Sequence, residues 1–381
     1  GYLTLHYYPL HLGFSDGEAL CTINSQFNCD AVSASRFSAF LGIPMAVWGF
    51  ATNFILLVML LVYGLNLTEQ RARCLRMMVL ISGFTALMSI IMGLISLFYL
   101  NTYCLFCILA YISSFFAFEA LRREQEEAFF THIKQDIFGL FTSSRIYLLY
   151  FLFIPACALF THKFFLQQYG ADNLEDIVRT SLLEWQAENK FDFSLSPLVQ
   201  KGAPENQAAM TIVEFADFRC GHCKMASAPL GAFVNSQPDV TLKFYAFPLD
   251  SSCNSAIQRG DGLSCRLAKS VYCANQKEKG WDFHKLIFAN QEKISRKQTS
   301  EEVDWELKNF CEETGIDFNE LKTCMDAAET HEAIRKQSEL GVSARVEGTP
   351  TIYVNGKKLP RGQIINVLSS AYKQIKSQNP K

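Results

Sequence analysis

The sequence predicts a multidomain membrane protein, in which an all-α transmembrane bundle precedes an α/β domain. Three observations lead to this fold class. Four long apolar runs lie within the first 165 residues. Beyond that point charged side chains recur every few positions. Within residues 211–230 an alternating apolar segment leads into a CxxC pair, and a helical pattern follows. With 381 residues, the chain has room for two domains.

The membrane prediction depends on runs long enough to cross a hydrocarbon core, which takes about 20 apolar residues. The runs are 43–65, 77–100, 103–121 and 146–165. Their interiors lack charge, which is costly at the bilayer centre. Core helices of a soluble protein are the alternative, but four such runs make it a poor one. The start, GYLTLHYYPL, is similar to the end of an interfacial helix. We therefore expect a four-helix bundle with an incomplete first helix, plus a linking fifth helix.

The positions of basic side chains predict the orientation in the membrane, because cytoplasmic loops carry an excess of Lys and Arg. Residues 1–42 hold only Arg36 as a basic residue. The loop 66–76 and the segment 121–145 contain more Lys and Arg, namely Arg71, Arg73, Arg76, Arg122, Arg123, Lys134 and Arg145. We expect both segments to be cytoplasmic, and everything after residue 166 to lie on the other side. The totals of 35 basic and 37 acidic residues do not suggest a nucleic-acid partner.

Thirteen cysteines are present, and six of them form close pairs. The pairs are Cys21/Cys29, Cys104/Cys107 and Cys220/Cys223. All six fall on the predicted outer side, where disulfides are favoured over structural zinc. Paired CxxC motifs can also build a zinc site, but one pair opens a membrane helix, so we expect no metal. Cys74 and Cys157 are expected to have no redox role.

The CGHC pair is the strongest motif. A strand over Ile212, Val213 and Phe215 runs into Cys220-Gly-His-Cys223, and a helix should follow. Free N–H groups and the dipole at a helix N-terminus favour a thiolate. The pKa of Cys220 should therefore be low enough for attack near neutral pH. Strand, CxxC and helix in this order form the thioredoxin arrangement, and His222 is expected to help stabilise the thiolate.

A second motif, Gly348-Thr349-Pro350, precedes another apolar strand and an Asn-Gly turn. Together with roughly 125 largely helical residues between the motifs, this resembles the DsbA branch of the thioredoxin superfamily. The resemblance implies a cis-proline at Pro350, with Thr349 and Pro350 binding a client chain. It also implies that Glu214 is a buried acid that takes and returns the proton of Cys223.

Five further cysteines lie in this half of the chain. Cys253/Cys265 and Cys311/Cys324 are candidate structural disulfides, with 11 and 12 intervening residues. Loops of that size stabilise by roughly 2–4 kcal/mol when cross-linked. Cys273 is the odd member and might replace any of the four, so the pairing is left open.

The cysteines of the membrane half resemble those of the vitamin K epoxide reductase family over about residues 1–121. Cys21 and Cys29 flank seven residues, and Cys104-x-x-Cys107 opens a later helix. Two polar side chains match further positions of the family, Ser35 its Ser/Thr position and Tyr111 a tyrosine of its quinone pocket. The resemblance implies a quinone, ubiquinone or menaquinone, bordered by Cys107, Tyr111 and Ser35.

Together these resemblances imply a membrane domain over 1–121, a cytoplasmic loop and linking helix over 122–165, a tether over 166–206 and a DsbA-like domain over 207–378. The implied function is disulfide generation in exported proteins at a bacterial inner membrane, with clients, the quinone pool and the bilayer as partners. Electrons would pass from Cys220/Cys223 through Cys21/Cys29 and Cys104/Cys107 to the quinone. A quinone or vitamin K epoxide reductase that uses the soluble half as reductant is one alternative. A membrane-tethered peptide-binding chaperone without redox turnover is the other.

Overall fold

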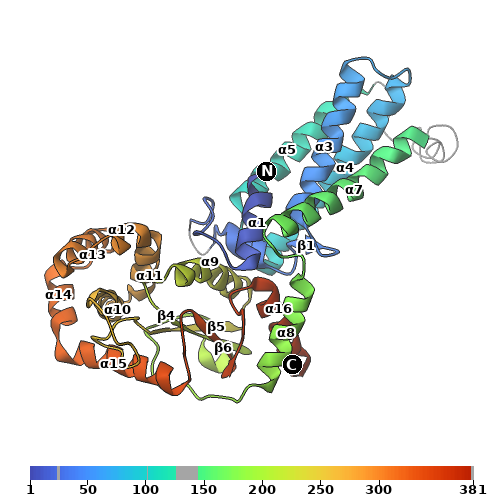
Figure 1. Ribbon diagram of the computed structural model, residues 1–381. Helices are drawn as coiled ribbons and strands as arrows, with labels where there is room; N and C mark the ends of the chain where they lie inside the picture. Colours follow the sequence, from blue (N-terminus) through green and yellow to red (C-terminus); the bar gives the residue numbers. More distant parts are fainter. Residues whose placement is uncertain (24–25, 101, 126–144, 379–381) are drawn as a thin grey trace. The chain divides into compact units, whose positions relative to one another are not determined.

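The computed structural model describes residues 1–23, 26–100, 102–125 and 145–378 (Figure 1). The chain divides into two compact units, residues 1–8 with 19–172 and residues 9–18 with 173–381. We call them the N-terminal unit and the C-terminal unit.

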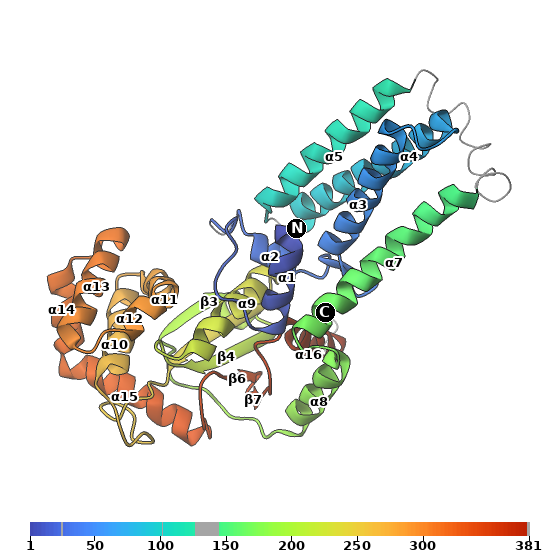
Figure 2. The same cartoon turned by 45° about the horizontal axis from the view of Figure 1, so that its top comes forward.

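The regular structure that is described for the N-terminal unit is helical, apart from one small two-stranded sheet. Figures 1 and 2 both show α3, α4, α5 and α7 as long helices running side by side. The elements are α1 (Tyr2–Leu12), α2 (Cys29–Ala34), β1 (Ala39–Phe40), β2 (Ile43–Pro44), α3 (Met45–Gly64), α4 (Arg71–Ile95), the π-helical turn η1 (Ser96–Leu100), α5 (Leu105–Glu124) and α7 (Arg145–Gln168).

Three helical segments of the described chain are long and apolar enough to cross a membrane, namely 45–64, 71–100 and 105–124. They contain most of the first three predicted runs, and α7 contains the fourth. The membrane prediction is confirmed in this sense. One detail was wrong: Arg71, Arg73 and Arg76 begin helix α4 instead of lying in a loop. Lys134 of the second basic segment lies outside the described residues.

Helices α4 and α5 pack antiparallel, as three contacts show. The Ser89 and Ser114 hydroxyls are 2.9 Å apart. A Cβ added at Gly83 would lie 3.1 Å from the Phe118 ring, and one at Gly93 would lie 4.0 Å from the Tyr111 ring. Glycines and serines allow such close approach of membrane helices. The basic start of α4 and the basic end of α5 therefore lie at the same end of this pair, opposite to Cys104.

The C-terminal unit contains a five-stranded mixed sheet in the order β3-β5-β4-β6-β7. Strand β4 pairs parallel to β5 and antiparallel to β6, so β4 is central. The strands are β3 (Val199–Gly202), β4 (Met210–Ala216), β5 (Val240–Ala246), β6 (Thr351–Val354) and β7 (Lys357–Lys358). The helices are α8 (Leu174–Ala187), η2 (Glu205–Gln207), α9 (Gly221–Ser236), α10 (Leu263–Asn275), α11 (Gly280–Ala289), α12 (Gln291–Ser295), α13 (Ser300–Thr314), α14 (Phe318–Asp326), α15 (Ala328–Ser343) and α16 (Ile365–Gln378).

The two faces of this sheet are covered differently because strand side chains alternate. Val213, Phe215 and Tyr245 point to a cluster that includes Leu340 at the end of α15. Ala216 and Phe244 point to the opposite cluster, which includes Cys223 and the helical segment α10–α14. This second cluster is the larger one, and it places the CGHC pair against the helical insertion. The predicted insertion is thus confirmed.

The predicted tether over 166–206 requires correction from residue 174 on. Helix α8 buries Trp185, whose indole N–H donates to the Val354 carbonyl at 3.1 Å. Strand β3 then pairs with β5 at the sheet edge. An amphipathic helix gains stability by burying its apolar face on a domain. For this reason residues 174–202 are part of the C-terminal unit.

Candidate redox sites

The CGHC pair lies where strand β4 gives way to helix α9. Three residues separate the end of β4 from Cys220, which is the N-cap of α9. Cys220 is half-buried and Cys223 is fully buried, and both are free thiols. The predicted order of strand, CxxC and helix is confirmed.

The two thiols ionise very differently. A hydrogen bond from Cys223 lowers the pKa of Cys220 to about 5; burial opposes this shift, and the backbone N–H groups of Cys223 and His222 support it. Burial keeps the pKa of Cys223 well above its usual range, and its hydrogen bond to Cys220 adds to this. At neutral pH the first sulfur is therefore a thiolate and the second a thiol, the division that thiol–disulfide exchange requires.

Glu214 is buried in the central strand, with only 1% of its surface exposed. It stands opposite Phe244 of β5 and Ile352 of β6. Burial raises its pKa to about 8, and the nearby charge of Cys220 acts in the same direction. Its Oε1 atom has no hydrogen-bond partner among the described residues. A carboxyl with a pKa this close to neutral pH can both give a proton to a neighbouring thiolate and take one back.

The loop before β6 lies beside the half-buried thiol. The Thr349–Pro350 peptide bond is cis, as expected. The Cys220 thiol lies 3.4 Å from the Thr349 carbonyl oxygen, to which it donates when protonated. His222 is exposed in the first turn of α9. Client binding by Thr349 and Pro350, and a role for the His222 side chain, stay predictions.

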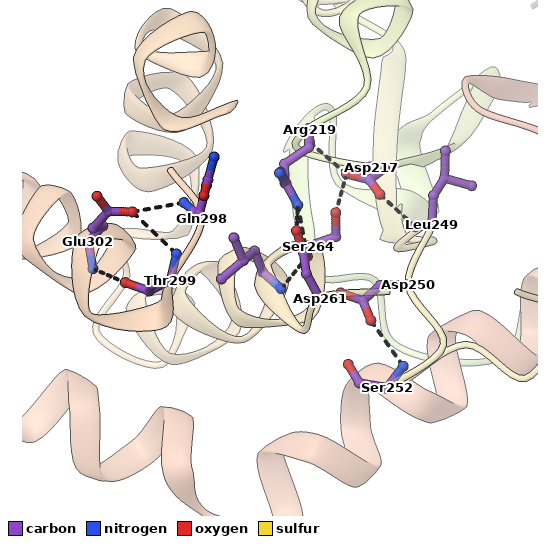
Figure 3. A network of polar contacts seen from close by, with 11 residues as sticks. Asp217, Arg219, Leu249, Asp250, Ser252, Asp261, Ser264, Gln298, Thr299 and Glu302 are labelled. Atoms are coloured by element: carbon purple, nitrogen blue, oxygen red, sulfur yellow. Dashed lines mark hydrogen bonds and ion pairs between the residues drawn. The ribbon is translucent and has the colours of Figure 1, made fainter. Parts of the chain in front are cut away.

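A polar network that sequence analysis missed fixes the chain just before Cys220 (Figure 3). The buried Asp217 carboxylate accepts from two backbone N–H groups, those of Arg219 at 2.6 Å and Leu249 at 2.5 Å. It also accepts from the Ser264 hydroxyl at 3.1 Å. Arg219 donates to both carboxylate oxygens of Asp261, at 2.8 and 2.6 Å. An acid three positions before Cys220 was the available local signal.

Gln291 of α12 was missed as well. Its buried side-chain amide donates to the carbonyls of Phe218 at 2.8 Å and Cys220 at 2.9 Å. No sequence signal links residues 71 positions apart, since only the packing of the insertion brings them together. Gln291 therefore connects the insertion to the backbone of the CGHC pair.

A second cysteine site lies in the N-terminal unit. Cys21 is bonded to Cys29, and Cys104 to Cys107. The sulfur atoms of Cys21, Cys29 and Cys104 all lie within 4.8 Å of one another, and all three residues are buried. Cys104 is the N-cap of α5, and its sulfur accepts from the Cys107 N–H at 3.1 Å. The Cys104 sulfur thus lies close to both sulfurs of the loop pair, as exchange between the two pairs would require once one pair is reduced to thiolates.

Backbone pairing brings the two disulfides together. Phe27 and Tyr103 form a parallel bridge. The Asn28 N–H donates to the Tyr103 carbonyl at 2.9 Å, and the Tyr103 N–H donates to the Gln26 carbonyl at 2.6 Å. The chain before Cys29 is therefore hydrogen-bonded to the chain before Cys104.

The two predicted quinone contacts differ in their surroundings. Tyr111 lies one helical turn after Cys107 and is half-buried, with its ring against Gly93. The Ser35 hydroxyl is buried and donates to the Val32 carbonyl at 2.8 Å at the end of α2. Ser35 thus has a capping role, and its contact to a quinone stays a prediction.

The sulfur cluster in the N-terminal unit also has the spacing of a metal site, but its chemistry is different. Metals bind thiolates, whereas Cys21 and Cys29 are joined in a disulfide. This arrangement is suited to disulfide exchange.

The candidate structural disulfides require a correction. Cys253 pairs with Cys265, but Cys324 pairs with Cys273, and Cys311 is a buried free thiol. Helices α10 and α14 pack closely enough to bring the Cα atoms of Cys273 and Cys324 to 5.9 Å, within the range a disulfide needs. Cys311 instead lies in the apolar core on α13.

Comparisons with known proteins agree with this division of the chain. Residues 1–120 match the vitamin K epoxide reductase family, and residues 211–373 match the DSBA-like thioredoxin domain. The chain is similar to "Probable disulfide bond formation protein D" of Bacillus anthracis, with 26% identity over 163 residues, which cover 41% of this chain and 70% of the relative. "Disulfide bond formation protein D" of Bacillus subtilis (strain 168) is 26% identical over 169 residues, with 41% and 69% covered.

Among solved structures, the oxidised form of BdbD from Bacillus subtilis is similar, with 21% identity and a TM-score of 0.40. That match covers 49% of this chain and 96% of the other. The chain therefore joins a domain of the vitamin K epoxide reductase family, over residues 1–120, to a DSBA-like thioredoxin domain over residues 211–373.

Proposed function

We propose that this protein is a membrane thiol–disulfide oxidoreductase that generates disulfides in exported proteins and passes the electrons to a quinone. The observation that carries the proposal is the cluster of Cys21, Cys29 and Cys104, whose sulfur atoms lie within 4.8 Å of one another. The thiolate–thiol pair at Cys220 and Cys223 supports it. The relatives named for disulfide bond formation support the same reaction class.

The first step takes place at the Cys220–Cys223 disulfide. A client thiolate attacks the more accessible Cys220 sulfur, the Cys220–Cys223 bond breaks, and Cys223 leaves with the electron pair. Glu214 then gives its proton to the Cys223 thiolate. A second client thiolate attacks the client sulfur of the mixed disulfide and releases Cys220 as a thiolate. The low pKa of Cys220, about 5, makes it a good leaving group.

Client binding in this step would depend on the backbone of the client and little on its amino-acid sequence. A client chain beside Pro350 would pair its backbone with the loop that precedes β6. The Thr349 carbonyl lies 3.4 Å from the Cys220 sulfur, so a chain held there would have its thiol beside the reactive atom.

The relay then passes to the N-terminal unit. The Cys220 thiolate attacks Cys21, and Cys29 leaves as a thiolate. Cys223, deprotonated through Glu214, attacks Cys220 and frees Cys21, which restores the Cys220–Cys223 disulfide. Next, Cys29 attacks Cys104, the Cys104–Cys107 bond breaks, and Cys107 leaves with the electron pair. Cys21 finally attacks Cys29 and releases Cys104, so the loop disulfide is restored and Cys104 and Cys107 are reduced.

The proposed quinone would bind beside Cys107. The Tyr111 ring lies one turn along α5 and packs against Gly93 of α4. Exposed Leu109 and Phe116 on the same helix would face lipid, in which a quinone dissolves. Cys107, Tyr111 and Ser35 would hold ubiquinone or menaquinone. When bound, the quinone supplies the two-electron oxidant that returns Cys104 and Cys107 to a disulfide.

The proposed location is a bacterial inner membrane, with the cysteine loop and the C-terminal unit on the outer side. The basic residues at the start of α4 and the end of α5 support this orientation. Exported thiols and the loop disulfide would then share one compartment.

The test replaces single cysteines in the full chain, reconstituted with a reduced unfolded client and a soluble quinone analogue. Cys107→Ala should abolish quinone reduction, and Cys223→Ala should accumulate a mixed disulfide between Cys220 and Cys21. Cys157→Ala is the control, because this free thiol lies outside the three pairs. Undiminished quinone reduction by Cys107→Ala would overturn the relay. Reduction of vitamin K epoxide in preference to quinone would favour the reductase alternative.

A further inference from the structure

A buried carboxylate lies next to the loop disulfide and has no role in the steps above. Asp30 follows Cys29 in the first turn of α2, and only 2% of its surface is exposed. Burying a carboxylate is costly unless it is paired or hydrogen-bonded. Its partners therefore indicate why this position holds an acid.

The partners of Asp30 lie on both sides of Cys21. Its Oδ2 atom accepts from the Ala19 N–H at 2.8 Å and from the Thr22 hydroxyl at 2.9 Å. The Thr22 hydroxyl also accepts from the Asp30 N–H at 3.4 Å. One carboxylate thus ties the chain around Cys21 to the residue that follows Cys29, and none of these bonds involves sulfur.

Helix α1 supports the same carboxylate from the other side. The His6 Nε2 atom lies 2.6 Å from Asp30 Oδ1. The Tyr2 ring stacks on His6 with centroids 5.8 Å apart, and its hydroxyl accepts from the Leu20 N–H at 3.0 Å. Tyr2 also contacts Phe106 edge-on at 5.2 Å, between Cys104 and Cys107. Helix α1 therefore supports the Cys21 segment directly through Tyr2 and indirectly through His6 and Asp30.

An ordinary helix-capping role does not explain these contacts. Asn28 is the N-cap of α2, and its side chain accepts from the Ala31 N–H at 2.8 Å. The Asp30 carboxylate instead bonds to the segment around Cys21 and to α1. Its interactions are tertiary, and they join the two halves of the redox loop.

We propose that Asp30, held by His6, is a positioning residue for the Cys21–Cys29 couple. It would keep the two sulfurs close after the disulfide opens, because its bonds to Ala19, Thr22 and His6 do not depend on the sulfur atoms. A high effective concentration of Cys21 at Cys29 speeds the last displacement, in which Cys21 attacks Cys29 and frees Cys104. It also stabilises the loop disulfide relative to the two thiols. The relay role rests on the proposed function, but the effect on the couple does not.

The experiment measures the equilibrium constant of each cysteine pair in the full chain in detergent. The chain is equilibrated in glutathione buffers, quenched by alkylation and digested, and the pairs are quantified separately by mass spectrometry. Asp30→Asn should lower the constant for forming Cys21–Cys29 about tenfold, equivalent to about 30 mV for a two-electron couple. The constant for Cys104–Cys107 should change less than twofold.

Two milder variants form a matched pair if Asp30→Asn folds poorly. Thr22→Val removes the hydroxyl that donates to Asp30, and Thr22→Ser retains it. We expect Thr22→Val to lower the equilibrium constant for forming Cys21–Cys29 several-fold. Thr22→Ser should leave this constant near the parent value. His6→Gln should lower it as well.

Two outcomes would overturn the proposal. One is an unchanged equilibrium constant for Cys21–Cys29 in both Asp30→Asn and Thr22→Val. The other is an equal shift in the equilibrium constants of Cys21–Cys29 and Cys104–Cys107, which would indicate general loosening of the N-terminal unit. The measurement needs neither a client nor a quinone, so its failure is distinguishable from failure of the proposed function.

Discussion

The ionisation of single residues controls the chemistry of the CGHC pair. Cys220 has its pKa lowered to about 5 from the ordinary 9.0, with the hydrogen bond from Cys223 as the largest cause. The thiolate contribution to the stability of the reduced state is complete above pH 9 and is lost as the pH falls through 5. The disulfide form has no such contribution, so the pair favours reduction and acts as an oxidant at neutral pH.

We predict that alkylation of Cys220 by iodoacetamide keeps a constant rate from pH 9 down to about pH 6, with its midpoint near 5. The reason is that the thiolate is the reacting form. In Cys223→Ala the midpoint should rise by about one unit or more, because the largest stabilising contact is removed. Rates are measured in the reduced full chain by mass spectrometry. A parent midpoint near 9 would contradict this account of Cys220.

A second prediction concerns Glu214. Its pKa is raised from 4.5 to about 8, mainly by burial. Between these values the folded carboxyl holds a proton that the unfolded chain has lost, so its contribution to stability falls as the pH rises from 4.5 to 8. Glu214→Gln removes this loss and should stabilise the C-terminal unit by roughly 1–3 kcal/mol more at pH 8 than at pH 5. It should also slow exchange at Cys223.

Thermal unfolding of the reduced chain at the two pH values tests the effect of Glu214→Gln on stability. Glu301→Gln is the control, because Glu301 is exposed in the first turn of α13. An equal effect of Glu214→Gln at both pH values would contradict the assignment of the buried proton.

At the scale of elements, the helical insertion does more than enclose the core. Gln291 of α12 donates to the carbonyls of Phe218 and Cys220. Asp217 anchors the same segment to Ser264 of α10. The conformation of the CGHC pair therefore depends on helices that follow it by more than 40 residues.

Removal of the Gln291 amide should loosen this segment. Gln291→Met keeps the approximate volume and leaves two carbonyls without a donor, which costs about 1–3 kcal/mol. We expect lower thermal stability of the C-terminal unit and a shifted midpoint for Cys220 alkylation. Gln298→Met on the following loop is the control. If both variants behave like the parent, Gln291 has no positioning role.

The two structural disulfides should differ in their effect on stability. The entropic cost of closing a loop rises with its length, so removal of Cys273–Cys324, with a separation of 51, should cost about 4 kcal/mol. Removal of Cys253–Cys265, with a separation of 12, should cost about 3 kcal/mol. Double alanine variants compared by denaturant unfolding give the two values. A reversed order would show that native-state contacts outweigh loop entropy.

At the scale of the whole molecule, the proposed relay would require the loop cysteines and the C-terminal unit to share one side of the membrane. A cysteine introduced at Glu69, between α3 and α4, should react with a membrane-impermeant maleimide only after permeabilisation. A cysteine introduced at Glu301 should react in intact spheroplasts. Both are placed in a chain with Cys220→Ala and Cys223→Ala. If the two positions were labelled from the same side, the predicted orientation would be wrong.

The sequence by itself determined the helical runs, the three close cysteine pairs and the strand–CxxC–helix order, because these depend on local composition and spacing. Glu214 and Pro350 were found through short motifs with a known family pattern. Only the tertiary structure decided the Cys273–Cys324 pairing, the contacts of Gln291, and the hydrogen bonds of Asp30 to Ala19 and Thr22 on either side of Cys21. Each joins residues that are distant in the chain or separated by a turn, and only packing of whole elements brings such groups within hydrogen-bonding or bonding distance.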